Sequence, residues 1–278
     1  MPEAGSTTKR ALSLTEQVQR LKERGLVIDD EAAAEAYLYD TNYYRLSGYA
    51  RQFQRDPRQG DNVFERGTSL ALLRELVAAD ALFARVLGRA LATIECTVRA
   101  RLSLHLALLH GNAAFYLQPD CYVAGLTDKV DALIAGIESD MRRDKGRTLR
   151  RYAPSSDDLS GVPIWVASEL LSFGTMSRML ELLDDKSPRD EVAKSFGERA
   201  GTFTTTVHSF SVLRNRCAHH GQIWHRMLSI QTPVDGRYKR RAGVRFKDHG
   251  PYPAILALRR MLPKAAGGAA CLAELDDF

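Results

Sequence analysis

The fold of this chain is decided by one long stretch, SLALLRELVAADALFARVLGRALATIECTVRARLSLHLALLH, residues 69–110. Large apolar side chains recur in it every three or four residues, the spacing that places them on one face of an α-helix. Thr68 or Ser69 is a suitable N-cap, and Gly111 marks the end. Because several arginines and glutamates interrupt the stretch, it cannot cross a bilayer. We therefore predict one very long core helix to about His110.

Helical signals also dominate the rest of the chain. Ser13 and Glu16 form a capping-box pattern and Gly25 closes the helix after it, whereas residues 55–67 and 154–161 are typical of loops. No segment alternates polar and apolar residues as a strand would. The predicted helices cover about 13–25, 29–39, 42–53, 127–145, 163–183, 188–199, 202–219 and 252–262, and the C-terminal tail is expected to fray. Residues 172–174, Ser-Phe-Gly, allow a local irregularity within the 163–183 helix.

These elements predict an all-α fold. We expect an N-terminal helical element over residues 1–66, a helical bundle over 67–232, and a basic C-terminal segment with one helix over 233–278. The 278 residues are 45% hydrophobic, which indicates a globular protein, and the net charge of +5 favours anionic partners. Cys96 and Cys217 are predicted to be buried, and the four cysteines form no CxxC pair, which suits the reducing cytoplasm.

The candidate chemistry lies in VLRNRCAHHGQIWHR, residues 212–226. On a helix, Val207, Phe210, Cys217 and Ala218 form one apolar stripe, and Arg214 falls in the middle of it. An unpaired guanidinium there is unfavourable, so Arg214 should point into a cleft, pair with an acid or face a second subunit. Asn215 and His219, four residues apart, share a different face.

An arginine and a histidine are the groups that cleavage of RNA requires. Arg214 can stabilise the charged phosphorane, His219 can move a proton, and the 2′-hydroxyl can serve as nucleophile without a metal. The simpler interpretation is a helix C-terminus with a histidine near the helix dipole. A metal site is not expected, because no acidic residue lies between Arg199 and Asp235.

Other charged residues allow two interpretations each. Glu95 and Arg99 suit an ion pair within the long helix, but Glu95 can also orient Arg214 or His219 from a facing helix. His220 is expected to pack nearby or support His219. Two basic clusters contain aromatic residues and suit single-stranded nucleic acid, although each can also be a solvated loop. They are Arg142, Arg143, Lys145, Arg147, Arg150, Arg151 and Tyr152, and Arg237, Tyr238, Lys239, Arg240, Arg241, Arg245, Phe246 and Lys247.

Three segments together resemble the abortive-infection (Abi) family of bacterial phage-defence proteins, in its AbiD/AbiF-like branch. They are NYYRLSGY at 42–49, PIWV at 163–166 continuing to LSFG at 171–174, and LRNRCAHH at 213–220 followed by Trp224. Family order is kept over about residues 10–228, and no family pattern is matched after Asp235. Tyr43, Tyr44, Tyr49, Trp165 and Phe173 are expected to be packing residues.

This resemblance implies a HEPN-like helical bundle, similar to ribonucleases in which an Arg-x(4–6)-His motif cleaves RNA without metal or other cofactor. Arg214, Asn215 and His219 match that motif, which in such proteins meets its copy at a dimer interface. We therefore expect a cytoplasmic, homodimeric endoribonuclease with a toxin-like role, whose products carry a 2′,3′-cyclic phosphate. The alternatives are a non-catalytic RNA-binding protein, with a regulatory or antitoxin RNA as partner, and a helical scaffold that senses a phage protein.

Overall fold

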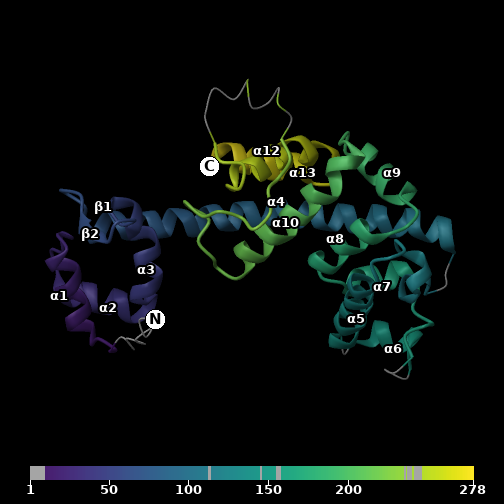
Figure 1. Ribbon diagram of the computed structural model, residues 1–278, viewed down its shortest axis with the longest axis horizontal. Helices are drawn as coiled ribbons and strands as arrows, with labels where there is room; N and C mark the ends of the chain where they lie inside the picture. Colours follow the sequence, from purple (N-terminus) through teal and green to yellow (C-terminus); the bar gives the residue numbers. More distant parts are fainter. Residues whose placement is uncertain are drawn as a thin grey trace, which may run out of the picture. The chain divides into compact units, whose positions relative to one another are not determined.

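A computed structural model describes residues 10–111, 114–144, 146–154, 158–234, 236, 240 and 246–278. In that part of the chain, twelve α-helices accompany one short two-stranded hairpin, which confirms the predicted all-α class (Figure 1). Contacts within the chain divide it into two units, Met1–Leu82 and Phe83–Phe278. The division falls inside the long helix α4 (Leu70–His110). The predicted three-part division, with boundaries at 66/67 and 232/233, stays a prediction.

The first unit has its own hydrophobic core. Its apolar centre includes Val18, Leu38, Leu46 and Phe64, all nearly inaccessible to solvent. Ser13 starts the first helix with the predicted capping box, shared with Glu16. The elements of this unit, besides the start of α4, are α1 (Leu14–Glu23), α2 (Glu31–Thr41), α3 (Tyr43–Ala50), the 3₁₀ turn η1 (Arg51–Phe53), β1 (Gln54–Asp56) and β2 (Asp61–Phe64).

The loop predicted at 55–67 is partly wrong, because β1 and β2 pair there as an antiparallel hairpin. Gln54 lies opposite Phe64 and Asp56 opposite Asp61, and Gly60 adopts the positive φ of 87° that the turn requires. Strands of three and four residues are too short for an alternating pattern to be visible in the sequence.

The tyrosines of the 42–49 segment have different environments. Tyr49 is buried and its hydroxyl donates to Asp80 Oδ2 at 2.7 Å, which ties α3 to the start of α4. Tyr44 is 84% exposed, so the prediction that it packs is wrong. The buried face of α3 carries Leu46, Tyr49 and Ala50, and Tyr44 lies off that face.

Helix α4 starts where the sequence predicts. The Ser69 hydroxyl accepts the Leu72 N–H at 3.1 Å, as an N-cap does, and the helix continues for 41 residues. Leu87, Leu91, Ile94 and Val98 are fully buried in the core of the second unit. Cys96 is exposed, against the prediction, because it lies on the opposite side of the helix from Ile94 and Val98. Among described residues, no helix is long and apolar enough to span a membrane.

The second unit packs the remaining helices around that part of α4. Contacts join α10 to α8, α9 and α12, and join α5 to α7 and α8. Its other elements are η2 (Phe115–Leu117), η3 (Pro119–Cys121), α5 (Thr127–Arg143), α6 (Arg147–Tyr152), α7 (Ile164–Leu170), α8 (Phe173–Leu182), α9 (Ser187–Ser195), α10 (Ala200–Ala218), α12 (Tyr252–Met261), η4 (Leu262–Lys264) and α13 (Gly268–Asp277).

The single helix predicted over 163–183 is in fact two helices, α7 and α8. Ser172 interrupts it as an N-cap: its hydroxyl accepts the Thr175 N–H, and its own N–H donates to the buried carboxylate of Asp140 at 2.9 Å. Phe173 is buried as predicted, but Trp165 is 46% exposed on α7. The tail expected to fray forms α13, which buries Cys271 and Leu275.

Candidate active site

Helix α10, which carries the Arg-x(4)-His motif, is held in place by a continuously apolar inner face. Phe203, Val207, Phe210, Leu213 and Cys217 follow each other in steps of three or four residues and are buried. Ala218, predicted on the same stripe, is exposed because the helix ends there. The core therefore holds the helix firmly up to the turn that bears the motif.

The helix ends in a Schellman turn with a histidine in an unusual position. Gly221 N–H donates to Arg216 O at 2.8 Å and His220 N–H to Cys217 O at 3.2 Å, the two hydrogen bonds that define this motif. His220, the first residue after the C-cap, has φ = 54°, a left-handed conformation usually taken by glycine. Gly221 has no room for a side chain, because a Cβ would lie 2.8 Å from Arg216 Cγ.

Of the three environments that the sequence allowed for Arg214, the structure shows a pair with an acid. Its Nε lies 3.0 Å from Glu95 Oε2; the Arg214 side chain is 40% exposed and that of Glu95 only 8%. The guanidinium is therefore fixed at its Nε edge, and part of it faces solvent. Its Nη1 also lies 3.5 Å from the Asn215 side-chain oxygen.

Glu95 joins two arginines rather than one. The ion pair expected within α4 is present, with Arg99 Nη2 at 2.8 Å from Glu95 Oε1, and both side chains are buried. Arg99 also donates to the carbonyl oxygens of Ser168 and Leu171. Those carbonyls lie at the end of α7, where a helix has no partners of its own for them. The break at Ser172 thus supplies acceptors that orient Arg99, and through Glu95 the network reaches Arg214.

Asn215 and His219 are exposed at the end of α10. His219 is the C-cap residue, and its N–H donates to Asn215 O at 3.0 Å, so the two residues share the last turn. His220, expected to support His219, is exposed as well. The structure thus brings a half-exposed guanidinium, a carboxamide and an imidazole together at one helix end, and their chemical roles stay predictions.

A second histidine on α10 has a different environment. His208 Nδ1 lies 2.9 Å from the hydroxyl of Ser177, which is buried and donates to Gly174 O. Burial lowers the pKa of His208 from its ordinary value, Glu181 opposes this shift, and Arg178 adds to it. His208 is therefore a packing residue that stays neutral near pH 7.

The predicted RNA-binding cations divide into described and undescribed residues. Arg142 pairs with Glu138 at 3.1 Å and Arg143 with Asp140, so both have carboxylate partners within α5. Arg240 is exposed. Arg237, Tyr238, Lys239 and Arg241 lie outside the described residues.

Sequence reasoning missed two features of this region. The carbonyls of Ser168 and Leu171 take part in the Arg99 network, and only the helix break reveals them. Trp224, five residues after His219, is 46% exposed, and apolar content alone predicts the opposite. The available signal was a tryptophan followed directly by His225 and Arg226.

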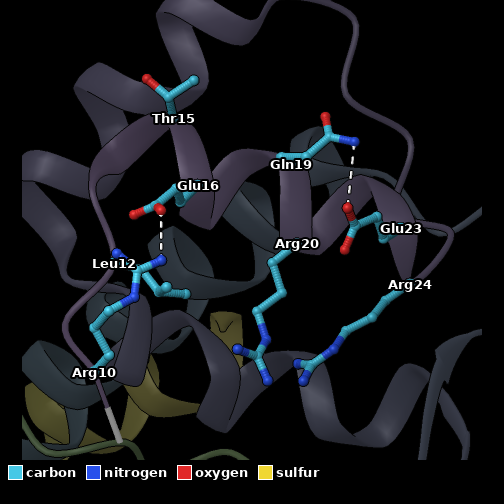
Figure 2. Close-up of a pocket in the computed structure, with 8 residues that line it drawn as sticks. All are labelled: Arg10, Leu12, Thr15, Glu16, Gln19, Arg20, Glu23 and Arg24. Carbon is cyan, nitrogen blue, oxygen red and sulfur yellow. Dashed lines mark hydrogen bonds and ion pairs between the residues drawn. The ribbon is translucent and has the colours of Figure 1, made fainter.

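The first unit contains a separate hollow along α1. Figure 2 shows the guanidinium groups of Arg20 and Arg24 on the same side of the helix, while Arg10 contacts Glu16. Glu16 and Glu23 place negative charge beside these arginines, and no imidazole is among the lining residues. Over the described parts of both units, no three His, Cys, Asp or Glu side chains are grouped so that they could hold a metal ion.

A family model covers all three sequence segments that carry the resemblance. The model of Abi-like proteins matches residues 36–225, well over half of the chain, and includes the break at Ser172 and the end of α10. No curated protein matches the chain, and no solved structure matches it either. The extent of the match means that the chain belongs to the family of Abi-like proteins.

Proposed function

We propose that this Abi-like protein is a metal-independent endoribonuclease of the HEPN type, which acts as a toxin-like effector. Family membership indicates a role in abortive infection. The observation that carries the nuclease proposal is the Arg214–Glu95 pair, 3.0 Å apart, which fixes a half-exposed guanidinium on the helix that ends at His219. A cation held in position and an imidazole open to solvent are the two groups that RNA transesterification needs.

In the proposed reaction, His219 accepts the proton of an RNA 2′-hydroxyl. The 2′-oxygen attacks the adjacent phosphorus, Arg214 stabilises the phosphorane, and Asn215 positions the phosphate. The bond from phosphorus to the 5′-oxygen then breaks, and that oxygen takes a proton. The products are a 2′,3′-cyclic phosphate and a 5′-hydroxyl. Because each motif contributes one His219, we propose that a second copy of the chain supplies the other proton-transfer group, in a homodimer.

The experiment compares Arg214→Ala and His219→Ala with Arg89→Ala. Arg89 is a suitable control because it is also a partly exposed arginine paired with a glutamate, Glu274, at 2.7 Å. Each motif variant should lose at least about 100-fold in RNA cleavage, measured in chelator, since removal of such a group typically costs that much. Arg89→Ala should cleave like the wild type, and all three should keep the same fold and sedimentation coefficient.

An RNA with a single 2′-deoxy nucleotide at the cleaved position tests the chemistry directly. It should resist cleavage because it has no internal nucleophile. Cleavage of this RNA, or activity that survives in both motif variants, would refute the proposal. Salt-sensitive RNA binding without any cleavage would instead favour the non-catalytic RNA-binding protein. An RNA that co-purifies with the chain would then be a candidate regulatory partner.

A further inference from the structure

We infer that Trp224 is a stacking platform for an unpaired base of the RNA held at the end of α10. This inference rests on the proposed function, because it names the form of RNA that the same site accepts. It starts from the segment that follows the Schellman turn, residues 221–228, here called the display loop. None of these residues belongs to a helix or strand.

The display loop is anchored at both ends of its exposed part. Ile223 and Leu228 are buried at 1% and 4% exposure, and Leu228 N–H donates to His249 O at 2.6 Å. Arg216 of α10 reaches across and donates to Met227 O at 3.3 Å. Between these anchors Trp224 is 46% exposed. The indole is therefore presented by an ordered loop, because the residues on both sides of it are fixed to the core.

The backbone of this region is held in an unfavourable conformation. Among described non-glycine residues, positive φ occurs at Asn42, His220 and His225. His220 directly precedes the display loop, and His225 directly follows Trp224. Left-handed backbone is unfavourable for such residues, and the exposed part of the indole adds nothing to the core. Features that do not stabilise the fold and gather beside a candidate site are the ones expected to serve a ligand.

The chemistry of the display loop selects a nucleobase. The His225 ring lies beside the indole, with centroids 5.4 Å apart and planes inclined by 33°. Arg226 donates from Nε to Gln222 Oε1 at 3.1 Å, which places a guanidinium in the same loop. No Asp or Glu occurs from residue 200 to 234, so this segment carries no negative charge of its own. Aromatic rings next to cations are how proteins bind single-stranded RNA, whereas bases within a duplex are inaccessible to stacking.

The chain has two tryptophans, Trp165 and Trp224, and both are 46% exposed. This makes a matched pair. Trp165→Phe leaves Trp224 as the only indole, and Trp224→Phe leaves Trp165. Each variant is titrated with a short single-stranded 2′-O-methyl RNA of adenosine and uridine, which cannot be cleaved because it has no free 2′-hydroxyl. We expect fluorescence quenching in the Trp165→Phe protein and none in the Trp224→Phe protein.

Affinity provides a second measurement. Trp224→Ala should weaken binding of this RNA roughly 5- to 100-fold, the range for loss of one stacked base, and Trp224→Phe should retain most of the affinity. Trp165→Ala should bind like the wild type. An oligonucleotide with abasic sites should bind the wild type and the Trp224→Ala protein equally weakly.

The inference is overturned if both indoles respond alike, or if Trp224→Ala binds as tightly as the wild type. Failure of this inference can be distinguished from failure of the nuclease proposal. Cleavage that depends on Arg214 and His219, without any change in Trp224 fluorescence or in the affinity of Trp224→Ala, would refute only the stacking platform. A Trp224 signal in a protein that cleaves no RNA would refute only the nuclease.

Discussion

Helices α9 and α10 end in the same backbone motif but with opposite side-chain environments. After α9, Glu198 N–H donates to Ala193 O and Gly197 N–H to Lys194 O, with Gly197 at φ = 63°. Phe196 there is fully buried, and the Lys264 ammonium caps its carbonyl at 2.6 Å. After α10 the corresponding left-handed residue is His220, and His219 and His220 are exposed.

Each helix end also has a buried carboxylate that holds an arginine. Glu198 binds Arg260 at 2.9 Å beside α9, and Glu95 binds Arg214 at 3.0 Å beside α10. The α9 end buries its phenylalanine in the core and has a glycine, which carries no titratable group, at the left-handed position, as expected of a purely structural turn. The α10 end keeps its charged and titratable groups accessible and accepts an unfavourable backbone, which is the pattern expected of a site.

The largest effect should come from removing these two carboxylates. Glu95→Gln and Glu198→Gln should each lower the free energy of unfolding by about 3 kcal/mol, because a buried arginine (Arg99) or a largely buried one (Arg260) loses its counter-charge. Only Glu95→Gln should also reduce RNA cleavage, by at least about tenfold, since Arg214 loses its fixed position. Urea titrations and cleavage rates corrected for the folded fraction check this. Equal loss of cleavage in both variants would remove the distinction between the two helix ends.

Smaller changes in the free energy of unfolding are expected at the two left-handed positions, and the two changes should have opposite signs. His220→Gly should raise the free energy of unfolding by about 1 kcal/mol, because glycine adopts positive φ without steric cost. Gly197→Ala should lower it by about 1 kcal/mol or more, since its Cβ would also clash with the Lys264 side chain. Both changes are measured by chemical denaturation. A loss of stability in His220→Gly would mean that His220 contributes contacts worth more than its backbone strain.

The smallest expected effect concerns His208, the half-buried histidine of α10. Burial lowers its pKa in the folded protein, so the unfolded chain binds a proton first as the pH falls. Its contribution to stability is therefore complete above the unfolded pKa of about 6.5 and is lost progressively below it. In His208→Asn this part of the acid sensitivity should vanish. Thermal unfolding of both proteins at pH 7.5 and 5.5 gives the difference, and identical pH dependence would contradict the assignment.

Local patterns were sufficient to predict most helices. The start of α4 at Ser69 and the capping box at Ser13 depend on hydrogen bonds between residues three apart, so the local sequence is enough to predict them. The hairpin at 54–64 was not predicted, and at residues 172–174 the sequence predicted at most a local irregularity within one helix, not its end. The first is too short to show a period, and the second depends on Asp140, a residue distant in the sequence.

The candidate site was predictable in composition but not in geometry. The placement of Arg214 on an apolar helix face predicted a cleft, an acidic partner or a second subunit, and the structure shows an acidic partner, Glu95. That Glu95 serves Arg99 at the same time, and that Trp224 is held outside the core, are consequences of tertiary packing. No pattern within a single helix encodes them.

Helix α4 limits how the two units of such a protein can be exchanged by recombination. Its first turns give Leu70 and Leu73 to the core of the first unit, and later turns give Leu87 and Leu91 to that of the second. Each unit therefore includes part of one helix, and the boundary between the units lies inside that helix instead of in a linker. A gene fusion near residue 82 would leave each half of α4 in its own core, but the foreign unit would have to continue the helix without interruption.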